Sequence, residues 1–392
     1  MKSDISILGL GYIGLPFALL LSKKGFYINA VDINKNKVRV LNKGKFKSEE
    51  NEINKIYKSL KKKYINFSTK LSNSKFYILC LPTPLKKNFK CDLSYLVNGI
   101  KKISKVIKTN DTIIIESTVP IGTTSYLKSL LKKMRPDLKN NFNICFCPEK
   151  AIPGNTLYEM QNNERFIGAD KKTFNLVKKI YEKFSKKKIR NCKVEEAEAS
   201  KLIENSFRDN QLAFSNFIDI QLKKIHLDPK KIIKICNRHP RVNFLNPTIG
   251  VGGHCIPVDP YFLNFKKNKD NMILLSRKIN KTKTQDIAIK LKKILKNKKR
   301  EKVCLWGLGY KSGSSDLRES PSLKIIEYLK QSKFYISDPY FYLIKQKNYK
   351  LKNFISPSVA KKKCQFHIIL NLEKKYLRKN FTNMKYLEAD GL

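Results

Sequence analysis

The chain has 392 residues, of which 41% are hydrophobic, so it is long enough for two or three domains and too apolar to be disordered. Its formal net charge of +49 comes from lysines in short runs along the whole chain, such as Lys61–Lys63 and Lys361–Lys363. Because this charge is not clustered and no nucleic-acid-binding motif accompanies it, we expect no nucleic-acid partner, although a polyanion-binding protein remains an alternative.

Nine cysteines are scattered along the sequence without a Cys-x-x-Cys pair, and there are only four histidines. An odd number of cysteines in a chain of this length predicts a reducing, cytoplasmic compartment, and we expect no metal site. The apolar run Leu10–Leu21 lacks the cleavage site of a signal peptide, and no stretch is long enough for a membrane span. We therefore expect no membrane partner.

The N-terminal half alternates buried strands with helices. Residues 4–8 predict a strand, residues 12–24 a helix that Gly25 ends, and residues 27–31 a second strand. Four further buried strands are expected at residues 76–81, 112–116, 143–147 and 165–168. This alternation predicts a parallel, doubly wound sheet.

The pattern changes near Glu195, where one long helix is expected up to about Ile225. Shorter helices follow to about Leu295 around a glycine-rich loop at 250–253, and residues 296–302 are typical of a linker. Strands are then expected at 303–306, 334–337 and 366–371, with a helix at 320–331. The predicted fold is α/β, with two Rossmann-like doubly wound parallel-sheet domains (1–194 and 296–392) joined by a helical central domain (195–295).

A glycine fingerprint, Gly9-x-Gly11-x-x-Gly14, lies between the first strand and the first helix. The glycines allow a tight turn, close approach of a pyrophosphate and packing of helix on strand, and the helix N-terminus favours an anion. Asp32 ends the second strand, where a carboxylate can accept hydrogen bonds from a ribose and repel a 2′-phosphate. The glycine fingerprint together with Asp32 predicts binding of NAD rather than NADP.

Cys255 lies in the segment Gly250–Asp259, which has three glycines in its first four positions. A cysteine in such a loop, four residues before Asp259, is placed for covalent chemistry. A small buried hydrophobic residue is the alternative, and it is the interpretation we give to the other eight cysteines. His254 is a base or ligand candidate, but no second histidine lies nearby.

The long helix carries Lys201, Asn205 and Arg208 at spacings of four and three, which places them on one face. These polar residues interrupt an otherwise apolar pattern. A solvated face explains them equally well from spacing alone.

At these residues the sequence resembles the UDP-glucose/GDP-mannose dehydrogenase family over nearly its whole length. The similarity lies in ordered motifs: residues 9–16, Pro82–Pro84, Glu116–Pro120, Cys147–Glu149, Ala197–Lys201 with Asn205, Gly252–Cys255, Gly307–Lys311 and Asp316–Pro321. The second glycine loop, Gly307-x-Gly309-x-x-x-Gly313, departs from the dinucleotide spacing by one residue, which fits a different nucleotide.

The resemblance implies an NAD-dependent four-electron oxidation of a UDP-sugar alcohol to a carboxylate. Cys255 would form the thiohemiacetal and thioester, Lys201 and Asn205 would stabilise the oxyanion, Asp259 would organise the base chemistry, and Thr118 and Glu149 would position or activate water. The NAD contacts it implies are Gly9, Gly11, Tyr12, Ile13, Gly14, Asp32, Thr83 and Thr118. The substrate contacts are Lys201, Asn205, Arg208, His239, Arg241, Gly252, Lys311 and Arg318.

Within the family, the segments 204–209 and 237–243 are most similar to the branch that oxidises UDP-N-acetyl-D-mannosamine. A UDP-N-acetylglucosamine 6-dehydrogenase, or an enzyme for another UDP-sugar, remains an alternative. The long helix is similar to the family's dimer-forming element, so a homodimer or larger homo-oligomer is expected. A two-electron hydroxyacid dehydrogenase also uses a long helix and a catalytic lysine, but that class has no need of Cys255.

Overall fold

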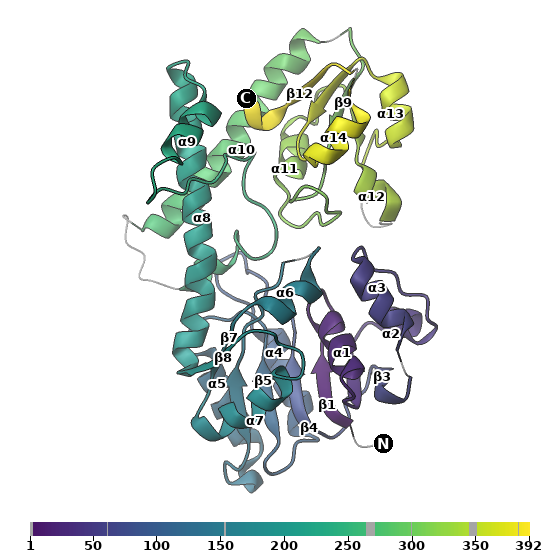
Figure 1. Ribbon diagram of the computed structural model, residues 1–392, viewed down its shortest axis with the longest axis vertical. Helices are drawn as coiled ribbons and strands as arrows, with labels where there is room; N and C mark the ends of the chain where they lie inside the picture. The colour runs from purple at the N-terminus through teal and green to yellow at the C-terminus, as the bar shows by residue number, and fades with distance from the viewer. Residues whose placement is uncertain are drawn as a thin grey trace. The chain divides into compact units, whose positions relative to one another are not determined.

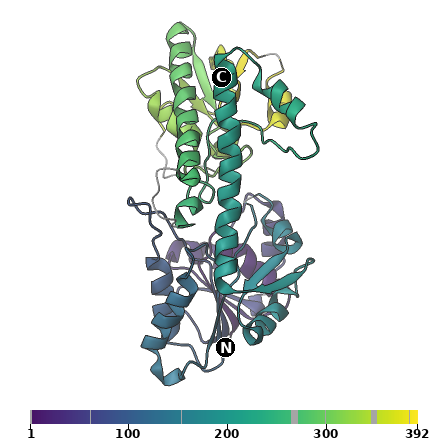
Figure 2. The ribbon, with the colours of Figure 1, turned by 90° about the vertical axis from the view of Figure 1, so that its left-hand side faces the viewer.

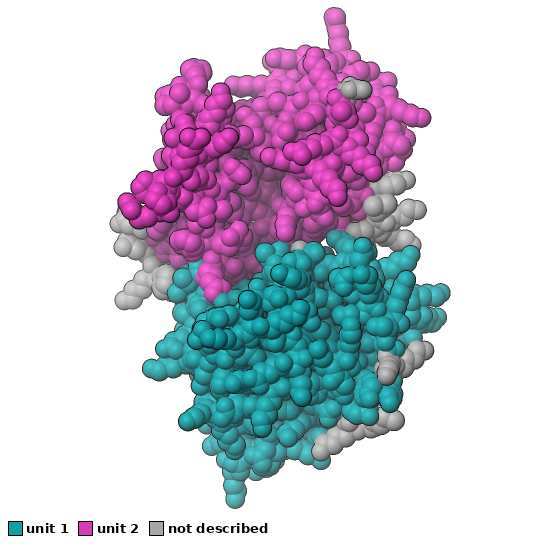
Figure 3. Space-filling view, in the orientation of Figure 1, with its two compact units in different colours: residues 1–203, 261–264 teal, residues 204–260, 265–392 magenta. Residues whose placement is uncertain are grey.

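The computed structural model describes residues 3–60, 62–152, 154–263, 271–298, 300–344, 351–382 and 384–392. The chain divides into two compact units, residues 1–203 with 261–264 and residues 204–260 with 265–392 (Figure 3). The division falls inside the long helix α8 (Val194–Lys224). The division into three domains at 194 and 295 stays a prediction.

The first unit contains a sheet with the strand order β3-β2-β1-β4-β5-β6-β7-β8 among the described residues. Strands β1 to β6 are parallel, as expected from the sequence, whereas β7 pairs antiparallel with β6 and β8 is parallel to β7. The strand bounds are β1 (Ser3–Leu8), β2 (Ile28–Val31), β3 (Ile65–Ser68), β4 (Ser74–Leu79), β5 (Thr112–Ile115), β6 (Asn143–Phe146), β7 (Arg165–Gly168) and β8 (Ile189–Cys192).

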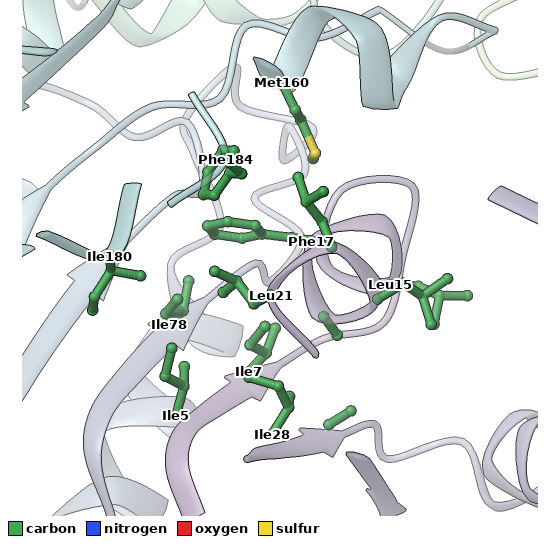
Figure 4. Close-up of a cluster of buried hydrophobic side chains, with 14 of the residues drawn as sticks. Ile5, Ile7, Leu15, Phe17, Leu21, Ile28, Ile78, Met160, Ile180 and Phe184 are labelled. Atoms are coloured by element: carbon green, nitrogen blue, oxygen red, sulfur yellow. The ribbon is translucent and has the colours of Figure 1, made fainter. Parts of the chain in front are cut away.

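Helices cover both faces of this sheet (Figure 1). Because side chains alternate along a strand, Ile78 packs with the α1 side of the core, whereas Tyr77 and Leu79 pack with the α4 and α5 side. Figure 4 shows the α1 side, where Phe17 lies among the buried side chains. The helices are α1 (Gly14–Lys23), α2 (Lys35–Asn42), α3 (Asn51–Lys58), α4 (Ser94–Ser104), α5 (Thr123–Met134), α6 (Thr156–Asn162) and α7 (Lys171–Tyr181).

The second unit begins with the C-terminal part of α8, beside which α10 (Met272–Asn297) lies in Figures 1 and 2. Buried ion pairs join the two helices: Arg277 to Asp209 at 2.6 Å and Lys283 to Asp219 at 2.5 Å. The sequence predicts that the helices after α8 end at about Leu295 before a linker, and α10 ends at Asn297, before β9 begins at Val303. The charged residues that interrupt the apolar pattern of α10 are buried against acids of α8. The short helix α9 (Pro229–Cys236) lies between them in sequence.

A second, smaller sheet has the order β10-β9-β11-β12 in the described chain, and its strands are all parallel. The elements are β9 (Val303–Trp306), α11 (Pro321–Tyr328), β10 (Tyr335–Ser337), α12 (Pro339–Ile344), α13 (Pro357–Lys363), β11 (Phe366–Ile369), α14 (Lys374–Asn380) and β12 (Tyr386–Glu388). The sequence analysis missed β3, β8 and β12. All three lie at sheet edges and are partly exposed, so they lack the continuous apolar run of a central strand.

Candidate functional site

The glycine loop after β1 leaves space where a dinucleotide needs it. A Cβ on Gly14 would lie 1.8 Å from the Gly9 carbonyl oxygen, and one on Gly9 would lie 2.4 Å from the Cys80 carbonyl oxygen. A Cβ on Gly11 would meet nothing within 4 Å. Two glycines are thus required by packing, and the third leaves the backbone open to a pyrophosphate.

The first turn of α1 is free to bind an anion. Ile13 is its N-cap residue and makes no side-chain capping hydrogen bond, and the turn contains no acidic residue. The N–H groups of a helix N-terminus carry a partial positive charge. Tyr12, which is 42% exposed, lies beside this turn. The loop and helix therefore fit the NAD contacts that the sequence implies at residues 9–14.

Asp32 directly follows β2 and is held at the glycine loop. Its carboxylate accepts hydrogen bonds from the Leu10 N–H at 3.1 Å and the Asn34 N–H at 2.9 Å. Lys37 lies 3.5 Å from the same carboxylate and donates a hydrogen bond to the Leu10 carbonyl. These contacts fix the acid beside the loop, where a ribose of the dinucleotide is expected.

Thr83 and Thr118 follow the carboxyl ends of the adjacent strands β4 and β5. The Thr83 hydroxyl donates a hydrogen bond of 2.8 Å to the Thr118 carbonyl, which ties the two segments together. Ligands of open α/β sheets bind at the carboxyl ends of the strands. The structure thus brings these two candidates together at the expected edge.

Glu149 follows β6 at the same edge and is buried. One carboxylate oxygen accepts the N–H groups of Lys150 at 2.7 Å and Ala151 at 2.9 Å. The other oxygen accepts a hydrogen bond from the guanidinium of Arg165. Sequence reasoning named Glu149 but missed Arg165, whose only signal was a charged residue at the start of an apolar strand.

Lys201 lies on α8 in the first unit and is 8% exposed. One turn earlier, the Glu198 carboxylate accepts the N–H groups of Gly122 at 2.6 Å and Thr124 at 2.8 Å, so it caps the N-terminus of α5. Burial raises the pKa of Glu198, although these hydrogen bonds lower it. This contact fixes the rotation of the helix that presents Lys201.

Cys255 begins a single helical turn in the second unit. Its carbonyl accepts the N–H groups of Val258 at 2.9 Å and Asp259 at 2.8 Å. Asp259 is 3% exposed, and its carboxylate accepts a hydrogen bond of 2.5 Å from the Asn205 side chain. The structure thus brings Cys255, Asp259 and Asn205 together, and the Cys255 side chain is partly exposed.

Three other cysteines, Cys145, Cys147 and Cys304, are buried, and burial raises the pKa of each thiol. A raised pKa disfavours the thiolate, which is the nucleophilic form. Their interpretation as small core residues agrees with this environment. Burial also raises the pKa of the partly exposed Cys80, whereas a hydrogen bond with Cys304 lowers the pKa of the buried Cys364.

The glycines before Cys255 pack against the loop between β9 and α11. The Gly253 N–H donates a hydrogen bond of 3.0 Å to the Arg318 carbonyl, and a Cβ on Gly253 would lie 2.8 Å from the Tyr310 ring. A Cβ on Gly252 would lie 2.7 Å from Pro321. Two motifs that are about 60 residues apart in sequence therefore form one surface in the second unit.

Lys311 and Arg318 are exposed on this loop. The Arg318 guanidinium forms hydrogen bonds of 2.5, 2.9 and 3.0 Å to the Asp316 carboxylate, and the Arg318 side chain stays 43% exposed. Arg208 is exposed on α8. These cations are accessible to an anionic ligand, although the described contacts do not join them to one another.

His239 and Arg241 lie in an exposed turn after α9. The Arg241 N–H donates a hydrogen bond of 3.3 Å to the His239 ring, and Asn237 closes the turn by two hydrogen bonds to the Phe244 backbone. The Phe244 ring stacks on Phe214 of α8 at 5.3 Å. The structure thus presents this pair on the surface.

Models of three domains of one family match the chain in order. The NAD binding domain of the UDP-glucose/GDP-mannose dehydrogenase family matches residues 3–185, the central domain matches residues 195–282, and the UDP binding domain matches residues 304–389. The chain belongs to the UDP-glucose/GDP-mannose dehydrogenase family. It is an NAD-dependent oxidoreductase, and the third match supports a UDP-sugar substrate.

Relatives from several organisms support this membership. A UDP-N-acetyl-D-mannosamine dehydrogenase of Methanocaldococcus jannaschii is 37% identical over 83% of this chain and 76% of its own length. An NDP-N-acetyl-D-galactosaminuronic acid dehydrogenase of Ralstonia nicotianae is 33% identical over 83% of this chain and 80% of its own length.

Solved structures have the same fold. The UDP-D-ManNAc dehydrogenase of Pyrococcus horikoshii is 29% identical, with a TM-score of 0.84 over 100% of this chain and 99% of its own. The UDP-N-acetyl-mannosamine dehydrogenase Cap5O of Staphylococcus aureus is 27% identical, with a TM-score of 0.86 over 99% of this chain and 94% of its own. Among the described residues, no helix has the length and apolarity needed to cross a membrane.

Proposed function

We propose that the protein oxidises the C6 alcohol of UDP-N-acetyl-D-mannosamine to the carboxylate through a covalent intermediate on Cys255. The overall reaction consumes two NAD and one water and yields two NADH and three protons. The observation that carries the proposal is the turn that places Cys255 four residues from Asp259, which is hydrogen-bonded to Asn205 on α8.

Each site residue has a role that its surroundings support. Bound NAD supplies the hydride acceptor for both oxidations, and the residues proposed to hold it are Gly9, Gly11, Tyr12, Ile13, Gly14, Asp32, Thr83 and Thr118. The Cys255 sulfur adds to the aldehyde carbon, and Lys201 and Asn205 stabilise the resulting oxyanion. After the second oxidation, Glu149 and Thr118 position the water that hydrolyses the thioester, and Asp259 organises proton transfer near Cys255.

The substrate is proposed from the relatives' names and from the segment that contains His239 and Arg241. Further substrate contacts are proposed at Arg208, Gly252, Lys311 and Arg318. Arg208, Lys311 and Arg318 are exposed cations, which can pair with the negatively charged diphosphate of a UDP-sugar. UDP-N-acetylglucosamine or another UDP-sugar remains the alternative substrate, and one relative, from Ralstonia nicotianae, is named an NDP-N-acetyl-D-galactosaminuronic acid dehydrogenase.

A homodimer or larger homo-oligomer is proposed from α8. Its aromatic residues Phe207, Phe214 and Phe217 are 60%, 53% and 41% exposed, and their spacings place them on one face. Such an exposed apolar stripe is typical of a surface between subunits. A reducing, cytoplasmic compartment is proposed from the nine scattered cysteines of the sequence, whose number is odd.

A panel of UDP-hexosamines tests the proposal. Purified protein is incubated with NAD and each sugar, and NADH is followed by absorbance while the acid is measured separately. We expect UDP-N-acetylmannosamine to give two NADH per acid formed. One NADH per sugar would reject the four-electron reaction. No NADH from any sugar, with salt-sensitive DNA binding instead, would favour the polyanion-binding alternative.

A cysteine variant tests the covalent step. Cys255→Ser is expected to lose acid formation, because an alcohol replaces a far better nucleophile and leaving group. Cys192→Ser, at another partly exposed cysteine outside the proposed site, is the matched control and is expected to keep the wild-type rate. Unchanged acid formation by Cys255→Ser would overturn the covalent mechanism.

A further inference from the structure

A buried charge cluster lies at the carboxyl edge of the first sheet. Arg165 donates a hydrogen bond to Glu149, and its other terminal nitrogen lies 3.9 Å from the Glu116 carboxyl. The Tyr181 hydroxyl donates a hydrogen bond to the same Glu116 oxygen. The side chains of the arginine and of both acids are at most 4% exposed. Charged side chains are rarely buried to this extent unless they are paired.

The reversed direction of β7 places Arg165 in this cluster. Gly168, the last residue of β7, pairs antiparallel with Phe146, the last residue of β6. Extending that register by three residues sets Arg165 opposite Glu149. If β7 were parallel to β6, its first residue would lie at the other end of the sheet, away from the expected ligand edge.

The guanidinium is held on its other sides by aromatic rings. It lies 5.0 Å from the Tyr181 ring centroid and 5.4 Å from that of Phe184. Its Nε and Nη1 atoms have no hydrogen-bond partner among the described residues. The hydrogen bond to Glu149 is therefore the directional contact that this side chain makes to a carboxylate, and the rings restrict its other movements.

The surroundings of the second acid of the cluster, Glu116, disfavour its charged form. Burial raises the pKa of the Glu116 carboxyl to about 8; Arg165, Tyr181 and Lys201 lower it, and Glu149 raises it. The buried thiols that also face Glu116 are those of Cys80, Cys145 and Cys147. The direct ion pair of Arg165 is with Glu149, whereas its distance to Glu116 is 3.9 Å. The effect of Lys201 on Glu116 also places this cluster beside a proposed catalytic residue.

We propose that Arg165 is a positioning residue for thioester hydrolysis, because it fixes the carboxylate of Glu149 that accepts a proton from the attacking water. This inference rests on the proposed function. In the step, a C–O bond forms from water to the thioester carbon and the C–S bond to Cys255 breaks. Glu149 takes the proton from water and returns it to the departing sulfur, and no electrons are exchanged.

A trapping experiment on the full-length enzyme tests this role. Arg165→Lys keeps the charge but loses the planar fork, and Glu149→Gln removes the base itself. With saturating NAD and UDP-N-acetylmannosamine, we expect both variants to keep the initial burst of NADH. Steady-state turnover should fall on the order of 100-fold, since small misplacements of a reacting group have effects of that size. A covalent uronyl adduct should accumulate on Cys255 and be visible by mass spectrometry.

Arg135→Lys is the matched control. Arg135 also pairs with a carboxylate, Asp137, in the first unit, but it lies outside the buried cluster and Asp137 is 60% exposed. We expect this variant to keep wild-type turnover without an adduct. A positioning role also predicts unchanged NAD affinity in Arg165→Lys, whereas damage to the fold would lower NAD affinity and the burst together.

A double variant covers the case in which Arg165→Lys does not fold. Removing both members of a buried ion pair is far better tolerated than removing one. If Arg165 acts through Glu149, Arg165→Gln/Glu149→Gln should turn over at the rate of Glu149→Gln alone. A lower turnover of the double variant than of Glu149→Gln, or loss of the burst in Arg165→Lys, would overturn the role of Arg165 but not the proposed function. Wild-type acid release by Glu149→Gln would overturn the proposed role of Glu149 as well.

Discussion

The two sheets each begin with a strand, a Gly-x-Gly loop and a second strand that ends in an aspartate, yet the two loops are built differently. In the first unit, α1 begins at Gly14, directly after the loop. In the second unit, α11 begins only at Pro321, and the intervening loop packs on the glycines before Cys255. The short connection to α1 places the helix N-terminus at the glycine loop. The long connection to α11 instead provides the surface on which the segment before Cys255 packs.

The aspartates differ in what they bind. Asp32 and Asp338 each accept a hydrogen bond from the backbone N–H between the loop glycines, at 3.1 Å from Leu10 and 2.6 Å from Leu308. Asp338 also accepts the N–H groups of Tyr340 and Phe341 and is 1% exposed. Burial raises its pKa, although these backbone hydrogen bonds lower it. Asp338 therefore stabilises the fold, whereas the partly exposed Asp32 can still contact a ligand.

The helix N-termini differ in the same way. Ser320 caps α11, because its hydroxyl oxygen accepts the Leu323 N–H and its O–H donates to the Leu308 carbonyl at 2.6 Å. Ile13 provides no such cap to α1. The same local fold thus supports a dinucleotide site where the helix N-terminus has no side-chain cap and the aspartate stays partly exposed.

The largest expected effect separates the two roles of glycine in the first loop. Gly14→Ala places a methyl group against the Gly9 carbonyl, so we expect the loop to distort and NAD affinity to fall at least about 100-fold. Gly11→Ala has space for its methyl group and should keep the wild-type melting temperature while weakening NAD binding. Titration with NAD and thermal unfolding measure both. Wild-type NAD affinity in Gly14→Ala would show that a methyl group at this position does not distort the loop.

The next effect compares the buried acids of the two units. Asp338 is surrounded by backbone N–H groups, whereas Glu116 is buried with a pKa of about 8. Because this pKa is raised above its unfolded value of about 4.3, the associated stability is present below pH 4 and lost as pH rises to about 8. Relative to Glu116→Gln, wild-type stability should fall on the order of 3 kcal/mol between pH 4.5 and 8. Chemical denaturation at several pH values measures it.

An exposed acid serves as the control for that measurement. Glu52 is 68% exposed in its side chain, so the stability difference between wild type and Glu52→Gln should not change across the same pH window. A flat difference for Glu116→Gln as well would show that Glu116 is ionised in the folded protein throughout the range.

Two matched substitutions test the aspartates. Asp338→Asn should lower the unfolding free energy by about 2 kcal/mol, because a carboxylate bound by several buried N–H groups is replaced by a weaker acceptor. It should leave the NAD affinity of the folded enzyme unchanged. Asp32→Asn should have the opposite pattern, with an NAD affinity about tenfold lower and little change in stability. The comparison fails if both variants change the same property.

The smallest effect concerns the helix caps. Ser320→Ala should cost about 1 kcal/mol of stability, which is typical for a lost N-cap. A serine introduced at Ile13, where α1 lacks a cap, should instead compete for the N–H groups and weaken NAD binding a few-fold. Denaturation and NAD titration of the two variants would distinguish capping from ligand binding. Stronger NAD binding by Ile13→Ser would contradict this view of the α1 terminus.

The sequence by itself determined the α/β class, the strand–glycine loop–helix unit with Asp32, and the family, because these depend on local periodicity and on motifs with fixed spacing. It also brought out Cys255, whose glycine-rich surroundings are visible over ten residues. The edge strands β3, β8 and β12 were not predicted, since half-exposed strands lack a continuous apolar pattern. The N-terminal half of α10 has no clear apolar period, because its buried positions include Ser276, Asn280 and Lys283, and Lys283 pairs with Asp219 of α8.

Only the tertiary structure decided which distant residues meet. The pairing of Asn205 with Asp259, and the packing of Gly253 on the loop that carries Arg318, join segments more than 50 residues apart. The antiparallel direction of β7 relative to β6, which brings Arg165 to Glu149, also cannot be predicted from the local sequence. Strand direction depends on the path of the chain between strands, whereas a short sequence window specifies only that a strand forms.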